Sequence, residues 1–132
     1  KQSIKIPVIG NGDVFTPEDF KERLESSGVD YILVARGAIG NPYVFKQISD
    51  YLKTGKYDQK DKLEQFDEYL KLAKKHKINF SQIKAQSINF TKEISKSAKL
   101  RVELAKARNL KDLLRGIDDF KNQQSPSLKC TN

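Results

Sequence analysis

Hydrophobic and polar positions follow two different patterns along this chain. In the first 55 residues, short apolar runs at 6–9 and 31–35 flank a stretch in which Phe20 and Leu24 recur at helical spacing. Apolar runs without alternation are typical of strands in a parallel sheet that is covered on both faces. The pattern therefore predicts one β-α-β unit, with a strand at 6–9, a helix at about 17–27 that stops at Gly28, and a strand at 31–35.

From residue 56 onward the apolar positions have helical spacing only. A polar linker at 54–61, TGKYDQKD, separates the two patterns. Apolar stripes such as Leu63, Phe66, Leu70 and Ala73 mark amphipathic helices. We expect helices at about 61–77, 80–94, 97–108 and 110–122, forming a four-helix bundle, and a frayed tail at 123–132.

The predicted fold class is α/β plus all-α, with residues 1–55 and 56–122 as separate domains. Two parallel strands do not make a stable sheet alone, because their outer edges present unpaired backbone groups. The sequence begins at Lys1, without a methionine, a few residues before the first strand. We therefore expect the chain to be a fragment whose sheet continues in a missing N-terminal segment of the same protein.

A glycine-bearing loop follows each predicted strand. The first, Gly10-Asn11-Gly12-Asp13, leads to Thr16 as a helix N-cap and Pro17 at the first helical position. The second, residues 36–42, reads RGAIGNP, and here Asn41 is expected to cap a short helix that begins at Pro42. The same arrangement of strand, loop and helix start thus occurs twice.

These two loops are expected to share one ligand. Loops that follow adjacent parallel strands lie at the same edge of the sheet, and in β/α barrels the last two such loops form a phosphate site. Backbone amides could converge on an anion there, with the Arg36 guanidinium adding a charge. The alternative is that both loops are only structural turns. The candidate phosphate ligands are Asn11, Gly12, Asp13, Ala35 and Arg36.

The surplus positive charge lies entirely in the second pattern. Residues 1–55 carry 7 basic and 7 acidic side chains, whereas residues 56–132 carry 18 and 10. Such a bias suggests a polyanionic partner. Lys92, Lys96 and Lys99 are spaced as if along one side of a helix, and Arg101 and Arg108 are seven residues apart; the alternative is an ordinary solvated face. The candidate contacts to nucleic acid are Lys84, Lys92, Lys96, Lys99, Arg101 and Arg108.

Several other functions are not indicated. The sequence has no apolar run near 18 residues and no signal-like leader, so we expect a cytoplasmic protein without membrane contact. Cys130 is the single cysteine and lies in the polar tail, and His76 has no acidic or cysteine neighbour in sequence. Neither a disulfide nor a metal site is expected.

The segments IPVIGNGDVFTPEDF and GVDYILVARGAIGNPYVFKQI resemble the end of the barrel in tRNA-dihydrouridine synthases. The later segments KAQSINFTKEI and AKLRVELAKARNLKDLLRGIDDF are similar to the helical domain that follows that barrel. The resemblance covers about residues 4–122. It implies an FMN-dependent oxidoreductase with a TIM (β/α)8 barrel, whose last β-α-β portion and helical tRNA-binding domain are present here.

The resemblance also assigns roles to residues. Asn11, Gly12 and Asp13 correspond to the first FMN-phosphate loop, and Ala35 with Arg36 to the second. Members of the family usually have glycine at the position of Ala35, and alanine can offer its amide there only if its φ is negative.

In the family the implied reaction reduces specific tRNA uridines. Reduced FMN passes a hydride to C6 of the uridine, and a protein acid protonates C5, with NADPH or NADH as the electron source. The resemblance places the cysteine proposed as that acid in earlier barrel strands, so no catalytic residue lies in this chain and Cys130 is not that cysteine. The isolated chain is expected to be inactive.

Two other functions agree with the same residues. Another phosphate-binding barrel enzyme, such as a sugar-phosphate isomerase or a different FMN oxidoreductase, would share the paired loops, although such enzymes usually lack a basic helical appendix. A non-enzymatic RNA-binding module would use the basic helices and keep the glycine loops as turns. The presence or absence of a flavin in the complete protein separates this module from a dihydrouridine synthase.

Overall fold

A computed structural model of the chain describes residues 3–124. The expectations for residues 125–132, including Cys130, lie outside this range. By backbone contacts the chain divides into two compact units, Lys1–Gln65 and Phe66–Asn132, which we treat separately.

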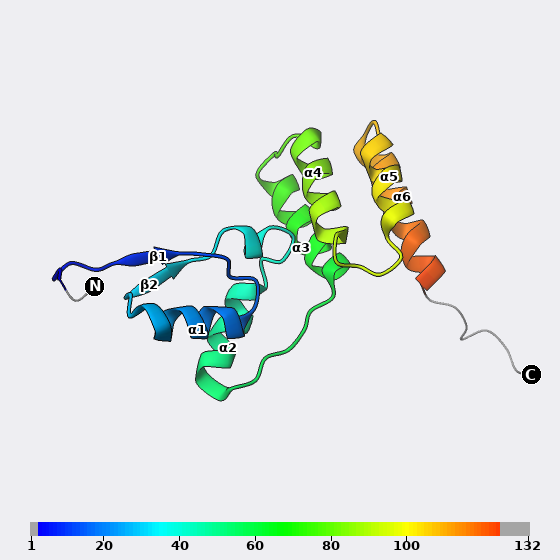
Figure 1. The fold of residues 1–132 in the computed structure, drawn as a ribbon. Helices are drawn as coiled ribbons and strands as arrows, with labels where there is room; N and C mark the ends of the chain where they lie inside the picture. Colours follow the sequence, from blue (N-terminus) through cyan, green and yellow to red (C-terminus); the bar gives the residue numbers. More distant parts are fainter. Residues whose placement is uncertain (1–2, 125–132) are drawn as a thin grey trace, which may run out of the picture. The chain divides into compact units, whose positions relative to one another are not determined.

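The first unit contains the predicted β-α-β arrangement. Its elements are β1 (Ile9–Asn11), α1 (Pro17–Ser27), β2 (Tyr31–Leu33), the 3-10 helix η1 (Arg36–Ala38) and α2 (Val44–Thr54) (Figure 1). The two strands pair in parallel, with Ile9 opposite Tyr31 and Asn11 opposite Leu33. The β-α-β prediction is confirmed.

The bounds of the first strand differ from the prediction of 6–9. Strand pairing begins only at Ile9, just after Val8 accepts hydrogen bonds from the backbone of Asp30 and Tyr31. The amide of Val8 donates to the Asp30 carboxylate at 2.8 Å rather than to a strand. Pro7 has no N–H to donate to a ladder. Apolar composition predicted a strand from residue 6, but the ladder begins later, because Pro7 has no N–H and the Val8 amide donates to Asp30.

The start of α1 follows its sequence signals. Thr16 is the N-cap, and its hydroxyl accepts from the Asp19 amide while the Asp19 carboxylate accepts from the Thr16 amide, which is a capping box. Pro17 takes the first helical position. Gly28 ends the helix with a φ of 62°, a left-handed conformation that glycine adopts without steric cost. The predicted helix at 17–27 is confirmed.

The start of α2 was predicted wrongly. The helix begins at Val44 behind Tyr43, not at Pro42 behind Asn41. The Asn41 side-chain oxygen does not cap the helix but accepts a hydrogen bond from the Gln65 amide at 3.2 Å. The Asn41 carbonyl accepts from the Val44 amide in a turn. The Asn41 side chain therefore does not cap the helix, because it is hydrogen-bonded to Gln65, a residue distant in sequence.

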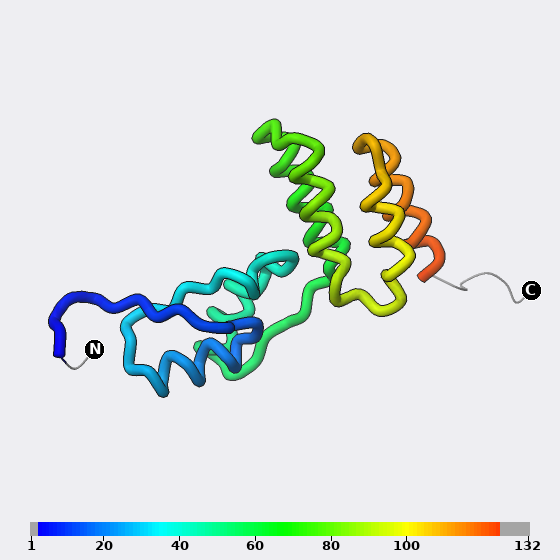
Figure 2. The backbone as a smooth tube through the Cα atoms, turned by 45° about the horizontal axis from the view of Figure 1, so that its top comes forward, coloured from blue at the N-terminus to red at the C-terminus, as the bar shows by residue number. Residues whose placement is uncertain are grey.

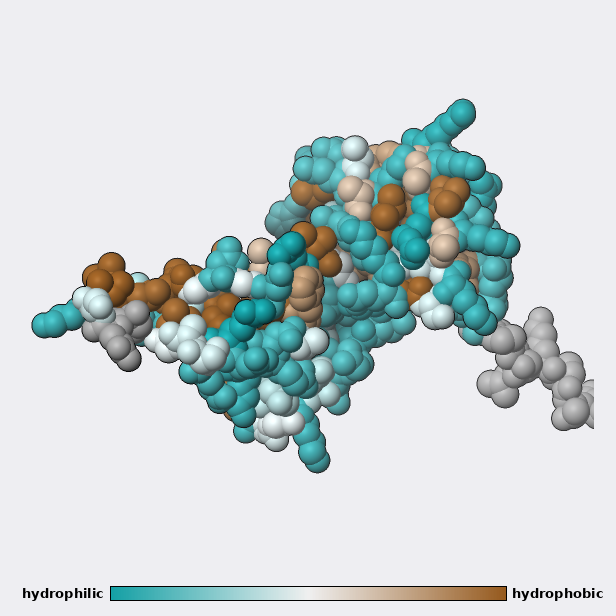
Figure 3. Space-filling model, in the orientation of Figure 1, coloured by the Kyte–Doolittle hydropathy of each residue, from teal (hydrophilic) through white to brown (hydrophobic). Residues whose placement is uncertain are grey.

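The core of the first unit lies on one side of the two strands. Val14, Val34, Val44 and Ile48 are buried together, and α1 packs on α2. The expectation that both faces of the sheet are covered is wrong for this chain. The residues that point the other way are exposed, Ile9 by 66%, Tyr31 by 62% and Leu33 by 52%. Figure 3 shows hydrophobic surface gathered over this strand region.

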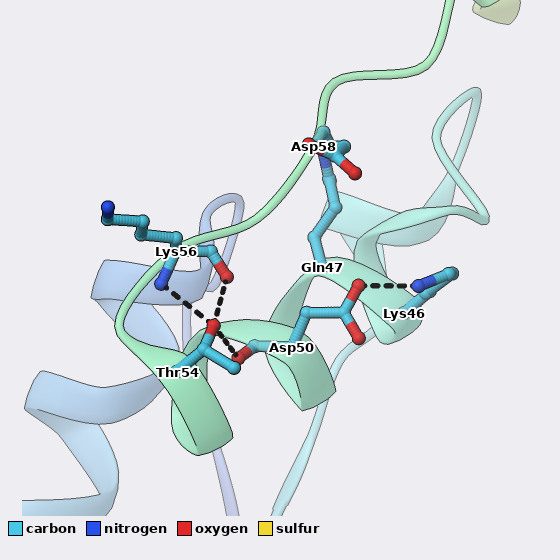
Figure 4. Close-up of polar contacts among 6 residues, drawn as sticks. All are labelled: Lys46, Gln47, Asp50, Thr54, Lys56 and Asp58. Carbon is cyan, nitrogen blue, oxygen red and sulfur yellow. Dashed lines mark hydrogen bonds and ion pairs between the residues drawn. The ribbon is translucent and has the colours of Figure 1, made fainter.

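The linker after α2 folds back onto the first unit. The Gln47 amide donates to the Asp58 carbonyl at 3.0 Å, and the Gln65 amide donates to the Lys60 carbonyl at 3.0 Å. Thr54 bonds both backbone groups of Lys56, as Figure 4 shows beside the Lys46 and Asp50 pair. Because Gln47 and Gln65 are buried and hydrogen-bonded, the linker is attached rather than free.

The four helices predicted after residue 60 are confirmed. They are α3 (Lys62–Lys75), α4 (Phe80–Thr91), α5 (Ala98–Lys106) and α6 (Leu110–Gln124), which follow one another along the backbone trace in Figure 2. The first residues of α3, up to Gln65, belong to the first unit. Helices α3, α4 and α5 stop two or three residues before their predicted ends, whereas α6 continues two residues past its predicted end, into the segment expected to be frayed.

The second unit is held by apolar side chains from all four helices. The rings of Phe66 and Phe90 meet edge to face at 5.7 Å, which joins α3 to α4. An ion pair of 2.8 Å between Lys121 and Asp67 joins α6 to α3. Within residues 3–124, no helix is both long enough and apolar enough to cross a membrane. The buried apolar residues of this unit are Phe66, Leu70, Ala73, Ile83, Phe90, Leu100, Leu104, Ala107, Leu113 and Ile117.

Candidate functional site

Two loops leave the same edge of the sheet in the first unit. The first loop (residues 12–16) joins β1 to α1, and the second loop (residues 34–38) joins β2 to the end of η1. The two strands are parallel and adjacent, so both loops leave from the carboxyl ends of the strands. This is the edge at which ligands bind in parallel α/β folds.

The two loops are packed against each other through Gly37. A Cβ atom added at this buried glycine would lie 2.0 Å from the Val14 carbonyl oxygen and 3.0 Å from the Phe15 Cα. No side chain fits in that space. Gly37 therefore lets the backbones of the two loops touch, and any other residue would push them apart.

An ion pair joins the same two loops at the surface. The Arg36 guanidinium contacts the Asp13 carboxylate, and both side chains are largely exposed, at 72% and 51%. One bond to Asp13 leaves Arg36 further N–H donors, because a guanidinium carries five. The structure thus brings together two of the five residues predicted to hold a phosphate, one from each loop.

Side chains of α1 fix the shape of the first loop. One oxygen of the Asp19 carboxylate accepts from the amides of Phe15 and Thr16, both at 3.0 Å. These bonds, the Phe15 amide foremost, hold the pKa of Asp19 below its usual value. From the middle of the helix, Arg23 Nε donates to the Asp13 carbonyl at 2.9 Å. The loop is therefore held from both its beginning and its end.

The remaining predicted residues lie around this contact. Asn11 is the last residue of β1 and is exposed, and Gly12 follows it directly beside the Arg23 side chain. Ala35 has a φ of −107°. The φ is negative, as it must be if an alanine at this position is to offer its amide. All five candidates thus lie in or next to the two loops.

The arrangement is chemically suited to an anion. It combines glycine-bearing backbone, a largely exposed arginine and the start of a short helix at the edge of a sheet, all of which favour negative charge. In the described part of the chain no group of histidine, cysteine and carboxylate side chains could hold a metal ion.

The predicted basic surface does not lie along one helix. Lys92 and Lys96 lie in the turn between α4 and α5, and only Lys99 lies in a helix. Similarly, Arg101 lies in α5 whereas Arg108 follows its end. The expectation that each set lines a helix is wrong, because α4 ends at Thr91. The three lysines and Arg108 are nevertheless exposed.

The other two basic candidates have internal partners. The Lys84 ammonium donates to the Ala107 carbonyl at 3.0 Å. The Arg101 guanidinium bonds Thr91 and Ser97 around the turn. A depression of about 430 Å³ nearby is lined by basic and acidic side chains alike, with Lys106, Arg108 and Arg115 beside Glu103, Asp112 and Asp119. The sequence shows how many basic side chains this half carries, but not which of them, such as Lys84 and Arg101, are hydrogen-bonded within the protein and which are exposed.

A family model described as "Dihydrouridine synthase (Dus)" matches residues 1–131 of the chain. The chain belongs to the dihydrouridine synthase family. The resemblance inferred from the glycine loops and from the helical segments is thereby confirmed.

Individual relatives carry the same name. A stretch of 70 residues, 53% of the chain, is 40% identical to "tRNA-dihydrouridine synthase B" of Pseudomonas putida. A stretch of 55 residues, 42% of the chain, is 54% identical to "Probable tRNA-dihydrouridine synthase" of Rickettsia conorii. The matched stretches span only 21% and 17% of the length of these two relatives.

Sequence reasoning missed three residues that hold the two loops or the segment directly after the second loop. Arg23 and Gln65 act across 10 to 24 residues of sequence, through hydrogen bonds to Asp13 and Asn41. No local pattern marks such pairs. The role of Gly37 was also missed, although a glycine directly after Arg36 could have signalled a close approach of backbones.

Proposed function

We propose that this chain supplies the FMN-phosphate loops and the tRNA-contacting helices of a tRNA-dihydrouridine synthase. The enzyme reduces specific uridines of tRNA to dihydrouridine with NADPH or NADH as the source of electrons. The observation that carries the proposal is the joining of two glycine loops by Gly37 and by the Asp13–Arg36 pair, in a chain that belongs to this family.

The residues present fit the phosphate of FMN. The amides of Asn11, Gly12 and Asp13 and those of Ala35 and Arg36 are the proposed donors, and the Arg36 guanidinium adds a charged hydrogen bond. The Asp13 carboxylate would repel a phosphate, but its pairing with Arg36 offsets that charge. FMN supplies the hydride in this reaction, and the part of this chain is to hold the phosphate end in place.

The β-α-β unit is proposed to be the last part of a TIM barrel. The exposed apolar residues Ile9, Tyr31 and Leu33 would lie inside the closed barrel, and the outer edges of β1 and β2 would pair with neighbouring strands. On this proposal the general acid and the groups that hold the flavin ring come from other parts of the barrel. The isolated chain is then inactive.

The helical half is proposed to contact tRNA. Its surplus positive charge and its exposed lysines Lys92, Lys96 and Lys99 are suited to phosphate groups of an RNA backbone. Arg108 adds a further exposed charge, and Lys84 and Arg101 remain in the candidate set. We further propose that α3 to α6 form a four-helix bundle, with residues 56–122 as the tRNA-binding domain.

The test uses the intact protein that carries this chain. We expect it to bind FMN and to form dihydrouridine in tRNA with NADPH or NADH. Replacement of Arg36 by alanine should weaken FMN binding about tenfold or more, since a hydrogen bond to a charged group contributes roughly 1.5 to 3 kcal/mol. Flavin fluorescence and the dihydrouridine content of the tRNA are the two measurements.

Arg115→Ala is the matched control for this experiment. It removes the same charge from α6, in the other unit, and should leave FMN binding unchanged. RNA binding without any flavin would favour the non-enzymatic module instead. Flavin binding without tRNA-dependent oxidation of the nicotinamide would point to a different FMN enzyme of the barrel class. Either result contradicts the proposed function.

A further inference from the structure

The turn that follows α4 concentrates exposed positive charge on a small piece of backbone. We call residues 92–99, the turn together with the first two residues of α5, the lysine turn, since Lys92, Lys96 and Lys99 are exposed along it. The residues that anchor it are buried, Thr91 and Ser97 each to 1% exposure. The turn therefore has a fixed base and a charged outer side.

The backbone of the lysine turn is in part unfavourable. Lys96 has a φ of 59°, the left-handed conformation that a lysine rarely adopts. A conformation of this kind costs of the order of 1 kcal/mol and persists only when the surroundings determine it. Some other group must hold the turn in place.

Arg101 is the side chain placed to do so. Its Nη1 atom donates to the Thr91 carbonyl at 3.1 Å and to the Ser97 hydroxyl at 2.6 Å. The Ser97 hydroxyl in turn lies within hydrogen-bond distance of the Thr91 carbonyl, at 2.7 Å, and of the Ile94 carbonyl, at 2.6 Å. One guanidinium thus ties the residue before the turn to a residue near its end.

The charge of Arg101 suits this place. Thr91 is the last residue of α4, and the final carbonyls of a helix lack partners within the helix and carry partial negative charge. The guanidinium bonds that carbonyl from the first turns of α5. Arg101 is half-buried, whereas the lysines around it are exposed.

We propose that Arg101 is a positioning residue for RNA binding, which holds the lysine turn in shape rather than gripping a phosphate itself. This inference rests on the proposed function, in which the lysines contact tRNA. A turn that is already fixed loses less conformational freedom when it binds, so its three ammonium groups bind more tightly. The candidate contact set then divides into lysines that touch RNA and an arginine that orients them.

Coupling between substitutions distinguishes positioning from direct contact. If Arg101 acts through the lysines, removing it should matter only while the lysines are present. If Arg101 binds a phosphate itself, its loss should cost the same affinity with or without them. A loss of general stability would also be independent of the lysines.

The experiment measures tRNA affinity of the intact protein against salt concentration in four forms. These are the wild type, Arg101→Gln, the triple variant Lys92→Ala, Lys96→Ala, Lys99→Ala, and the combination of both. We expect Arg101→Gln to weaken binding about fivefold in the wild type and less than about twofold in the triple variant, as coupled sites do. Ser97→Ala keeps the arginine charge and should behave like Arg101→Gln.

Arg108→Gln is the matched comparison, because Arg108 is an exposed arginine outside the lysine turn. As a direct contact it should lower affinity by the same factor in both backgrounds. Equal losses for Arg101→Gln in both backgrounds, or no loss in either, would overturn the positioning role. Thermal unfolding of each variant, followed by circular dichroism, separates a folding defect from a binding defect. If Arg101→Gln does not fold, the same comparison with Ser97→Ala tests the positioning role.

The proposed function is tested separately within the same set. If the triple variant binds tRNA as the wild type does at every salt concentration, the lysine turn is not the RNA surface and both statements fall. If the triple variant loses affinity and its salt slope becomes shallower, but Arg101→Gln is not coupled to it, only the positioning role is wrong.

Discussion

Gly37 is the residue on which the contact between the two loops depends. Its missing side chain allows the second loop to lie against the Val14 carbonyl of the first. The Asp13–Arg36 ion pair is exposed at the same place and contributes little stability by itself, since surface ion pairs are screened by water and salt. Packing of backbone on backbone, more than charge, therefore fixes the distance between the loops.

We expect Gly37→Ala to separate the two loops. Its Cβ would fall 2.0 Å from the Val14 carbonyl oxygen, so the backbone must shift, at a cost of about 1 to 3 kcal/mol as in other overpacked sites. FMN affinity should fall with stability. The measurements are flavin titration and urea unfolding of the intact protein.

Gly116→Ala is the control for this substitution. Gly116 lies in α6, where an added Cβ would come no closer than 3.7 Å to the Glu103 carboxylate. Alanine favours a helix over glycine by about 1 kcal/mol, so this variant should be as stable as the wild type or more stable. If both glycine variants bind flavin equally well, the close contact at Gly37 does not control the site.

The Asp19 carboxylate makes the stability of the first loop depend on pH. Its carboxylate accepts from the Phe15 and Thr16 amides, and these bonds lower its pKa in the folded protein. A carboxyl whose pKa is lower in the folded state stabilises that state at pH values above its unfolded pKa, which is about 3.9. This contribution is lost as pH falls through the lower, folded pKa.

We therefore expect Asp19→Ala to destabilise the protein at pH 7 by about 0.5 to 2 kcal/mol, the usual contribution of a helix cap. The difference from the wild type should begin to shrink as pH falls below the unfolded pKa of about 3.9, and it should be lost once pH passes the lower, folded pKa. Urea unfolding at pH 7 and at pH 3 measures both values. Glu22→Ala, which removes an exposed acid from the same helix, is the control and should change the free energy of unfolding at pH 7 by less than about 0.5 kcal/mol.

At the scale of elements, the sequence predicted which segments are helices and strands better than where they begin. Helix α1 has every local signal, with Thr16 at the cap and Gly28 at the end, and its bounds were correct. Helix α2 has equally good signals at Asn41 and Pro42 but begins at Val44, because Gln65 binds the Asn41 side chain. Local signals fail where a distant residue competes for the same group.

The same reason explains what could be predicted of the site. The five candidate phosphate ligands lie in or next to two loops whose proximity follows from the order of parallel strands, a rule that can be read from the sequence. The hold of Arg23 on the first loop depends on a helix-to-loop distance that only the structure gives. Likewise a break between the helices at 80–94 and 97–108 was predicted, but no glycine or proline marks its start at Thr91, which leaves Lys92 outside α4.

At the scale of the molecule, the boundary between the two units lies later than the change in sequence pattern. The polar linker at 54–61 suggested a division near residue 55, whereas the contacts place the first unit at Lys1–Gln65. The reason is the pair of buried glutamines, since Gln47 and Gln65 bind the linker backbone. The polar composition of the linker does not show this attachment, because the hydrogen bonds that hold it come from the side chains of Gln47 and Gln65.

Separate folding of the helical half is the corresponding prediction for the whole molecule. We expect a polypeptide of residues 61–124 to be helical and to unfold cooperatively, because the buried apolar residues from Phe66 onward come from all four helices, α3 to α6, and belong to one unit. Asp61 must be retained, since its carboxylate accepts from the amides of Leu63 and Glu64 at the start of α3. Circular dichroism against temperature is the measurement.

Two further polypeptides show what this folding depends on. Residues 66–124, without the first turn of α3, should melt at a lower temperature but still cooperatively, because Phe66 and its ring contact with Phe90 remain. Phe66→Ala in residues 61–124 removes that contact and should cost about 3 to 5 kcal/mol, the range for a buried phenylalanine, since Phe66 is only 1% exposed. A gradual, non-cooperative transition for residues 61–124 would show that the helices need the first unit in order to fold.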